Sequence, residues 1–98
     1  MRDVVWSDDA LDDFESSIAY IARDSARGAH SVADKIESAI QRLTDMPTGH
    51  QGRVKGTYEK LVQGTPYIVA YAMSDRRITI LRIIHAMRDW PDDTWPKT

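Results

Sequence analysis

Three residues near the end of the chain are of types that can move protons and stabilise negative charge. Arg82, His85 and Arg88 lie in the stretch ILRIIHAMRDW, residues 80–90. A histidine can act as a general acid or base near neutral pH, and arginines can hold a phosphate. Together they are the candidate catalytic residues of this chain. In the alternative interpretation, His85 is a partly buried ring bonded to a carbonyl, and Arg82 pairs with a carboxylate of a helix or of a bound peptide.

A second group of residues is better suited to binding than to catalysis. Residues 1–50 hold 10 acidic and 5 basic residues, whereas residues 51–98 hold 5 acidic and 8 basic residues. Such a basic half can hold an anionic partner, or it can be a solvated face that offsets the acidic half. The residues of the second half that we expect to bind a partner are Arg53, Lys55, Lys60 and Trp90.

Metal and cofactor chemistry are not expected. The 3 histidines show no metal-ligand spacing and the chain has no cysteine, so neither a zinc site nor a disulfide is predicted. Four acids (Asp8, Asp9, Asp12 and Asp13) resemble a metal site. They open a predicted helix, however, where the helix dipole favours two of them and solvent accommodates the rest. The sequence also lacks a phosphate-cradling glycine loop and a nucleophile motif.

The gross composition favours one domain in the cytoplasm. The chain has 98 residues, 42% of them hydrophobic and 29% charged, with a net charge of −2. No apolar run approaches the ~20 residues that cross a bilayer, and the N-terminus lacks the apolar core of a signal peptide. We therefore expect a single domain over 1–98 without membrane contact. The net charge argues against strong direct binding of nucleic acid.

Two amphipathic helices are predicted in the first half. Apolar residues at helical spacing (Leu11, Phe14, Ile18 and Ile21) indicate a helix from about 8 to 23, for which Ser7 is a suitable N-cap. After a break around 24–28, a second stripe (Val32, Ile36, Ile40 and Leu43) indicates a helix that Pro47 and Gly49 end. The pair, at about 8–46, predicts an antiparallel helical hairpin that must pack on something else.

The second half predicts strands joined by tight turns. Runs rich in β-branched and aromatic residues are expected to form strands at 54–62, 67–73 and 78–85, within the range 53–85, with Gly56 bending the first. A short tail, 86–98, follows. The last strand is apolar on both faces, which favours a central place in the sheet, with Arg82 on the face of Ile80 and Ile84. With residues 4–6 as an opening strand, the prediction is an α+β fold: a small, mostly antiparallel sheet in β-α-α-β-β-β order, with the helical hairpin on one face.

Taken in order, these segments resemble a known family. The stretch WSDDALDDFESSIAYIA, a helix ending RLTDMP, and then GRVKGTYEKLV, PYIVAY and ITILRIIHAMRDWP are similar to toxins of the RelE/ParE superfamily, the toxic halves of type II toxin–antitoxin modules. The resemblance covers about residues 4–91. It implies the small α/β fold of that family and growth inhibition by the free toxin. It also implies a cognate antitoxin bound in the groove between helices and sheet, with operator DNA contacted only through the antitoxin.

The superfamily divides by target. Members of the RelE type cut mRNA on the ribosome without a metal, using basic residues around the sheet. The resemblance places Ile68, Glu59 and Leu61 at three of those basic positions, although a shift by one residue would restore Lys60; Arg88 matches the fourth. Members of the ParE type resemble this chain more closely in the long helical hairpin and the LRxxH ending, and act on DNA gyrase without known catalytic residues. The resemblance thus favours gyrase as the target. Ribosome-dependent mRNA cleavage is the alternative, with His85, Arg82 and Arg88 as the catalytic residues that the resemblance then implies. A relative that has lost its toxicity is the third alternative.

Overall fold

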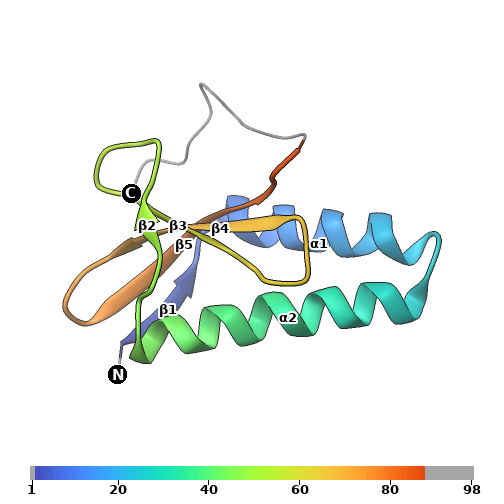
Figure 1. Ribbon diagram of the computed structural model, residues 1–98, viewed down its shortest axis with the longest axis horizontal. Coiled ribbons are helices and arrows are strands. Elements are labelled where there is room, and N and C mark those ends of the chain that lie inside the picture. The colour runs from blue at the N-terminus through green and yellow to red at the C-terminus, as the bar shows by residue number, and fades with distance from the viewer. Residues whose placement is uncertain (1, 88–98) are drawn as a thin grey trace.

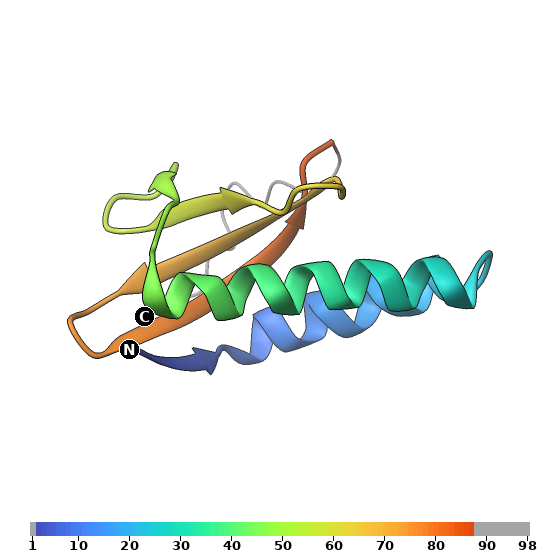
Figure 2. The same ribbon diagram turned by 60° about the horizontal axis from the view of Figure 1, so that its bottom comes forward.

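A computed structural model describes residues 2–87 of the chain. Its elements run β1 (Asp3–Trp6), α1 (Asp8–Ala22), α2 (Ala26–Asp45), β2 (His50–Gln51), β3 (Tyr58–Leu61), β4 (Tyr67–Met73) and β5 (Arg77–His85). The two helices form a hairpin that lies against one side of the sheet (Figures 1 and 2). This is the predicted α+β fold. None of the described helices is long and apolar enough to cross a membrane.

Both helices begin at a serine cap. The Ser7 hydroxyl oxygen accepts a hydrogen bond from the Ala10 N–H at 3.0 Å, as predicted for a cap that satisfies an unpaired amide. The second cap was not predicted: the Ser25 hydroxyl oxygen accepts from the Gly28 N–H at 2.9 Å. Ser25 caps α2, which begins at Ala26, so the break between the helices is shorter than the expected 24–28. The prediction was wrong for residues 26–28, and Gly28 lies inside the helix.

The sheet has five strands in the order β1-β5-β4-β3-β2. Strand β1 runs parallel to β5 and the other neighbours are antiparallel, so the sheet is mostly antiparallel as predicted. Strand β5 has a neighbour on each side, but β1 reaches only as far as its residue Ile80. The second half of β5 therefore has no strand beside it on that side among the described residues.

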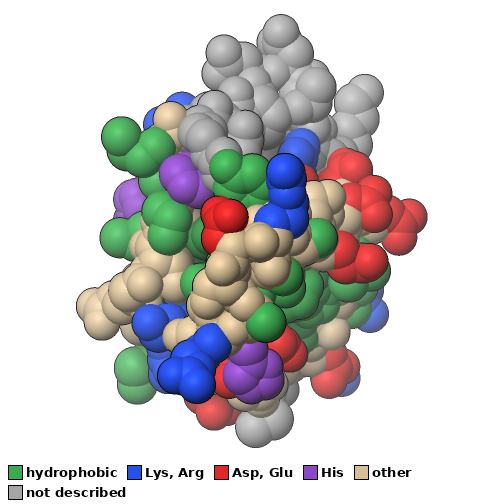
Figure 3. Space-filling view, turned by 90° about the vertical axis from the view of Figure 1, so that its right-hand side faces the viewer, with side chains coloured by type: hydrophobic (Ala, Val, Ile, Leu, Met, Phe, Trp, Pro, Cys, Tyr) green, Lys and Arg blue, Asp and Glu red, His purple; other side chains and the backbone are tan. Residues whose placement is uncertain are grey.

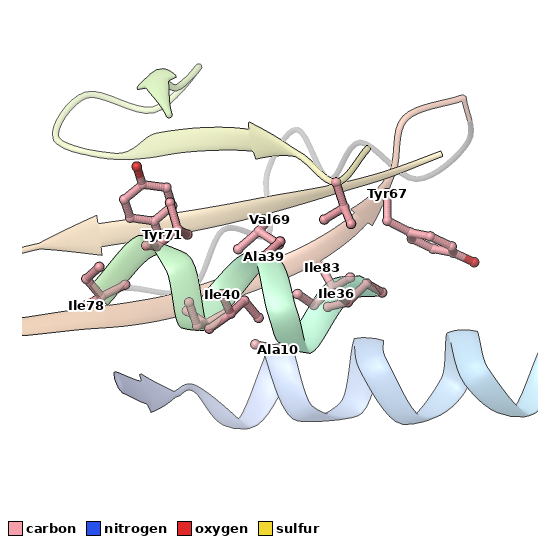
Figure 4. Packing of buried hydrophobic residues seen from close by; sticks show 12 residues of the cluster. Ala10, Ile36, Ala39, Ile40, Tyr67, Val69, Tyr71, Ile78 and Ile83 are labelled. Carbon is pink, nitrogen blue, oxygen red and sulfur yellow. The ribbon is translucent and has the colours of Figure 1, made fainter. Parts of the chain in front are cut away.

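The core lies between the sheet and the helices. Buried residues of α2 (Ile36, Ala39, Ile40 and Leu43) face buried residues of β4 and β5 (Tyr67, Val69, Tyr71, Ile78, Ile80 and Ile83). Figure 4 shows Val69 of β4 beside Ala39 of α2, and the Tyr71 hydroxyl directed toward β2. The predicted alternation of β4 is confirmed, because Tyr67, Val69 and Tyr71 all belong to this cluster and Met73 packs against it.

A β-bulge changes the predicted orientation of β5. Tyr71 pairs with Ile80 but the preceding Ala70 pairs with Arg82, so Leu81 is the extra residue. Side chains therefore change face at this point. Arg82 shares with Ile84 the face directed away from α2, as predicted, but it does not share a face with Ile80, which points into the core. That part of the prediction was wrong because strict alternation takes no account of a bulge.

The first strand of the second half is shorter than expected. Strand β3 covers only Tyr58–Leu61, and residues 52–57 form a loop instead of its start. Gly56 adopts a φ of 86°, a left-handed conformation that a regular strand does not use. The short strand β2, which precedes this loop and pairs with Tyr58 and Glu59, was not predicted.

Candidate functional site

The Arg82 guanidinium is bound by an aspartate of α1. Its Nε lies 2.7 Å and its Nη2 3.0 Å from the two carboxylate oxygens of Asp13. The same carboxylate accepts a hydrogen bond from the Ile83 N–H at 3.0 Å. Both side chains are less than one-fifth exposed. This confirms the prediction that a helix acid pairs with Arg82, but the expectation that solvent accommodates Asp13 is wrong.

The His85 ring lies on the other face of β5. It packs edge-on against Tyr67, with ring centroids 5.3 Å apart, and its Nδ1 accepts a hydrogen bond from the Met87 N–H at 3.2 Å. This hydrogen bond engages Nδ1 with the backbone that follows β5.

Arg82 and His85 are therefore not brought to one site. Arg82 opposes Ala70 on the face directed away from α2, whereas His85 opposes Tyr67 on the face directed toward α2. Arg88, and the candidate binding residue Trp90, lie outside the described residues. Within residues 2–87, no three histidine, aspartate or glutamate side chains gather in a way that could hold a metal ion.

Lys60 lies in a groove between α2 and β3. One part of it, about 260 Å³, is lined by Ala39, Arg42, Leu43, Met46, Thr48, Lys60, Leu61 and Gln63. A more polar part, about 280 Å³, is lined by Asp34, Lys35, Ser38, Arg42, Val62 and Gln63. Because Arg42 and Gln63 line both parts, they form one continuous groove, which we call the α2–β3 groove. Three bases and one acid line it, so it is basic as well as partly apolar.

The wall of this groove is an open sheet edge. Strand β2 pairs only with Tyr58 and Glu59, so among the described residues no strand covers the outer side of Lys60 and Leu61. The Val62 N–H bonds to the Tyr67 carbonyl, and alternation in an antiparallel ladder then directs the Leu61 N–H and C=O away from β4. The Leu61 side chain is 52% exposed and that of Met46 68%. Such an edge is a template for pairing with another chain.

The other two predicted binding residues lie elsewhere. Arg53 and Lys55 are on the loop 52–57, beyond the start of β3 and away from the groove. A buried glutamate holds this loop: the Glu59 carboxylate accepts from the Arg53 N–H at 2.8 Å, and Glu59 is only 6% exposed. The three bases that were expected to bind a partner are thus divided between two places.

A buried tyrosine fixes the segment that leads into β2. The Tyr71 ring stacks on Tyr58, with centroids 5.5 Å apart, and its hydroxyl accepts from the Gly49 N–H at 3.2 Å. Burial raises the pKa of the Tyr71 hydroxyl, an effect that the Gly49 hydrogen bond partly opposes. A Cβ on Gly49 would lie 2.6 Å from this oxygen, so the close approach requires glycine.

Comparison with known proteins identifies the family. The sequence model of the ParE toxin of the type II toxin–antitoxin system parDE matches residues 4–90. The chain belongs to the ParE toxin family. It is 36% identical to the putative toxin Y4kP of Sinorhizobium fredii over 88% of this chain and 90% of that protein. It is 34% identical to Toxin RelE2 of Caulobacter vibrioides over 90% of this chain and 99% of that protein.

Solved structures agree with this ParE-family fold. A chromosomal ParDE toxin–antitoxin system from P. aeruginosa gives a TM-score of 0.77 at 19% identity, over 87% of this chain and 96% of that one. The E. coli DinJ–YafQ complex gives a TM-score of 0.55 at 16% identity, over 85% of this chain and 91% of that one. At these identities the likeness shows the fold alone. The prediction of a type II toxin of the RelE/ParE superfamily is confirmed.

Proposed function

We propose that this ParE-family toxin inhibits growth when free by binding DNA gyrase, without a catalytic step of its own. The observation that supports this proposal is the separation of Arg82 from His85 on opposite faces of β5. Nuclease chemistry needs cationic groups and a proton carrier around one phosphate. Here the guanidinium is bound by Asp13, and the His85 Nδ1 accepts a backbone hydrogen bond.

Ribosome-dependent mRNA cleavage is the alternative, favoured by the similarity to a protein named Toxin RelE2. Two assays separate the targets. Purified toxin should inhibit supercoiling by gyrase and leave ribosome-bound mRNA intact. Cleavage of that mRNA, lost on His85→Ala and not on His30→Ala, would contradict the gyrase proposal. Expression without antitoxin should arrest growth in either case.

We further propose that the cognate antitoxin occupies the α2–β3 groove with an extended segment that adds a strand to the open edge of β3. The outward Leu61 N–H and C=O would supply the backbone hydrogen bonds of such an addition. Lys35, Arg42 and Lys60 line the groove, so the segment should carry acidic as well as apolar side chains. Charge complementarity of this kind raises the association rate and fixes the register.

Substitutions at Leu61 test this contact. Leu61→Glu should weaken antitoxin binding about tenfold or more. It removes an apolar contact that the proposed complex would bury, and its carboxylate repels an acidic segment. Leu61→Pro should weaken it more than Leu61→Ala, since proline removes the outward N–H but no bond to β4. Tyr20, on α1 and likewise 52% exposed, offers a matched control: Tyr20→Glu should leave the dissociation constant within twofold. Equal losses for the two glutamate variants would contradict the groove as the antitoxin site.

A further inference from the structure

The two parts of the α2–β3 groove differ in chemistry. The first part, which we call the apolar end, contains the exposed side chains of Met46 and Leu61 beside the buried Leu43. The second part, which we call the polar end, is lined by charged and polar residues, among them Lys35, Ser38, Arg42 and Gln63. No such separation is seen where the helical hairpin turns, because acidic, basic, histidine and hydrophobic side chains are mixed at that end of the molecule (Figure 3).

The bases of the polar end are not paired with an acid of the described structure. No carboxylate of the described residues forms a salt bridge with Lys35 or Arg42. The acid of β3, Glu59, directs its carboxylate away from the groove, to the loop that precedes β3, where it accepts a hydrogen bond from a backbone N–H. The charge of these two bases is therefore available to an anion of a bound partner.

Lys35 is directed across the polar end. A Cβ on Gly64, in the turn between β3 and β4, would lie 3.2 Å from the Lys35 Nζ, so the ammonium group reaches from α2 to the opposite wall. Ser38 and Gln63 line the same part, and their side chains can donate hydrogen bonds. Among protein side chains, a carboxylate is the group that accepts strong, charge-assisted hydrogen bonds from such a set of donors.

A single acid limits where a bound carboxylate can lie. Asp34 is the one acid among the described residues that line the groove, and its carboxylate lies 3.4 Å from the His30 Nε2. Because Asp34 precedes Lys35 on α2, a carboxylate bound beyond Lys35 would meet a like charge. Arg42, on the other side, lines both parts of the groove. An anion is therefore best placed between Lys35 and Arg42, beside Ser38.

The distance between the two ends of the groove suits an extended segment. Lys35 and Leu43 are eight residues apart on α2, which is about 12 Å at about 1.5 Å per residue. An extended chain covers that distance in about four residues, at about 3.3 Å each. Residues four apart on a strand point to the same face. An acidic and an apolar side chain at that spacing can therefore both enter the groove.

From these observations we propose that the α2–β3 groove selects its antitoxin through two subsites. In the polar end, one carboxylate of the antitoxin is bound between Lys35 and Arg42. In the apolar end, one large apolar side chain packs against Met46 and Leu61. The two antitoxin residues lie about four positions apart in an extended segment. This inference rests on the proposed antitoxin site and adds the chemistry and spacing of the residues that the site accepts.

Calorimetric titration of the full-length toxin with its cognate antitoxin tests the carboxylate subsite. Lys35→Met/Arg42→Met removes both charges but keeps long side chains, and should weaken binding about tenfold or more and make it less dependent on salt. The matched control is Arg23→Met/Arg27→Met, which removes two likewise exposed bases where the hairpin turns. The control should change the dissociation constant less than twofold.

The same titration tests the apolar subsite. Met46→Ser removes apolar surface from the groove and should weaken binding about tenfold. Met87→Ser, at another exposed methionine outside the groove, is the matched control and should change the dissociation constant less than twofold.

A double-mutant cycle identifies the antitoxin residues. Each acidic residue of the antitoxin's toxin-binding segment is changed singly to its amide. One of these changes should cost about tenfold against the wild-type toxin but less than twofold against Lys35→Met/Arg42→Met, because the contact is already gone. One apolar residue changed to alanine should show the same coupling to Met46→Ser. The two coupled antitoxin residues should lie about three to five positions apart.

The outcomes separate this inference from the proposed antitoxin site. A loss of binding with Leu61→Glu but not with Lys35→Met/Arg42→Met would overturn the carboxylate subsite and leave the groove as the antitoxin site. Unchanged binding in both variants would contradict the antitoxin site itself. Coupled antitoxin residues next to each other in sequence would overturn the proposed spacing. Circular dichroism of each variant should match the wild type, since Lys35, Arg42 and Met46 are all exposed.

Discussion

The two long edges of the sheet are treated differently. Beside the second half of β5, where β1 has ended, α1 takes the place of a strand. The Ser7 hydroxyl donates to the Leu81 carbonyl at 2.9 Å, and the Asp13 carboxylate accepts from the Ile83 N–H. Beside the second half of β3, no described strand pairs with the outward N–H and C=O of Leu61. One edge is closed by side chains of a helix, and the other is open next to a basic groove.

This difference indicates where a partner can be added without a cost to the fold. Exposed edges risk unwanted pairing, and proteins usually cover them. Here the closed edge uses an ion pair and two hydrogen bonds, so opening it would expose buried polar groups. The open edge is short and flanked by Lys60, Arg42 and Met46. It is therefore the edge that a neutralising partner can cover.

The largest effect is expected at the closed edge. Asp13→Ala would leave the Arg82 guanidinium and the Ile83 N–H without their acceptor, and should lower the free energy of unfolding by about 3 kcal/mol. The matched control is Asp12→Ala, an exposed neighbour, which should change stability by no more than about 0.5 kcal/mol. Urea unfolding measures both. If the two variants were equally stable, α1 would not be closing this edge through Asp13.

A smaller loss of stability is expected when either serine cap is removed, and the loss should differ between Ser7 and Ser25. Ser7→Ala removes the cap of α1 and the donor to the Leu81 carbonyl, and should destabilise by about 2 kcal/mol. Ser25→Ala removes only the cap of α2, which is exposed, and should destabilise by about 1 kcal/mol. Thermal unfolding of the two variants gives the comparison. A larger loss for Ser25→Ala would contradict the role of Ser7 at the sheet edge.

The smallest effect concerns Tyr71, which holds the segment leading into β2. Its pKa is raised above the usual value of 10.0, so the unfolded chain ionises first as pH rises. Its contribution to stability is therefore complete below about pH 10 and is lost above it, as the pH passes through the folded-state pKa. Tyr71→Phe should lose less stability than wild type between about pH 9 and pH 11. Identical losses would show that Tyr71 does not ionise differently in the two states.

Most of the fold was predictable because it depends on local patterns. The apolar stripes of α1 and α2 and the alternation of β4 follow from burial of one face. The errors occurred where a single residue breaks the period: Leu81 as a bulge and Gly56 in a loop. The short β2 depends on long-range pairing, for which two residues carry no periodic signal.

The candidate site was predictable only in part. The helix acid that binds Arg82 was expected, but not that it would be Asp13, because in the sequence Asp13 is indistinguishable from its exposed neighbours. The separation of Arg82 and His85 is set by the strand alternation. The division of Lys60 from Arg53 and Lys55 results from the loop that replaces the start of the predicted strand. A groove between helices and sheet was expected from the family resemblance, but its position between α2 and β3 was not, since that position depends on which strand of the sheet lies beside α2.

Amide hydrogen exchange at two residues tests the account most directly. In the free toxin the Ile83 N–H, bonded to Asp13, should exchange slowly and the Leu61 N–H rapidly. On addition of the cognate antitoxin, the Leu61 N–H should become protected and Ile83 should change little. If Leu61 stayed rapidly exchanging in the complex while protection appeared along β1 or α1, the open edge of β3 would not be where the antitoxin binds.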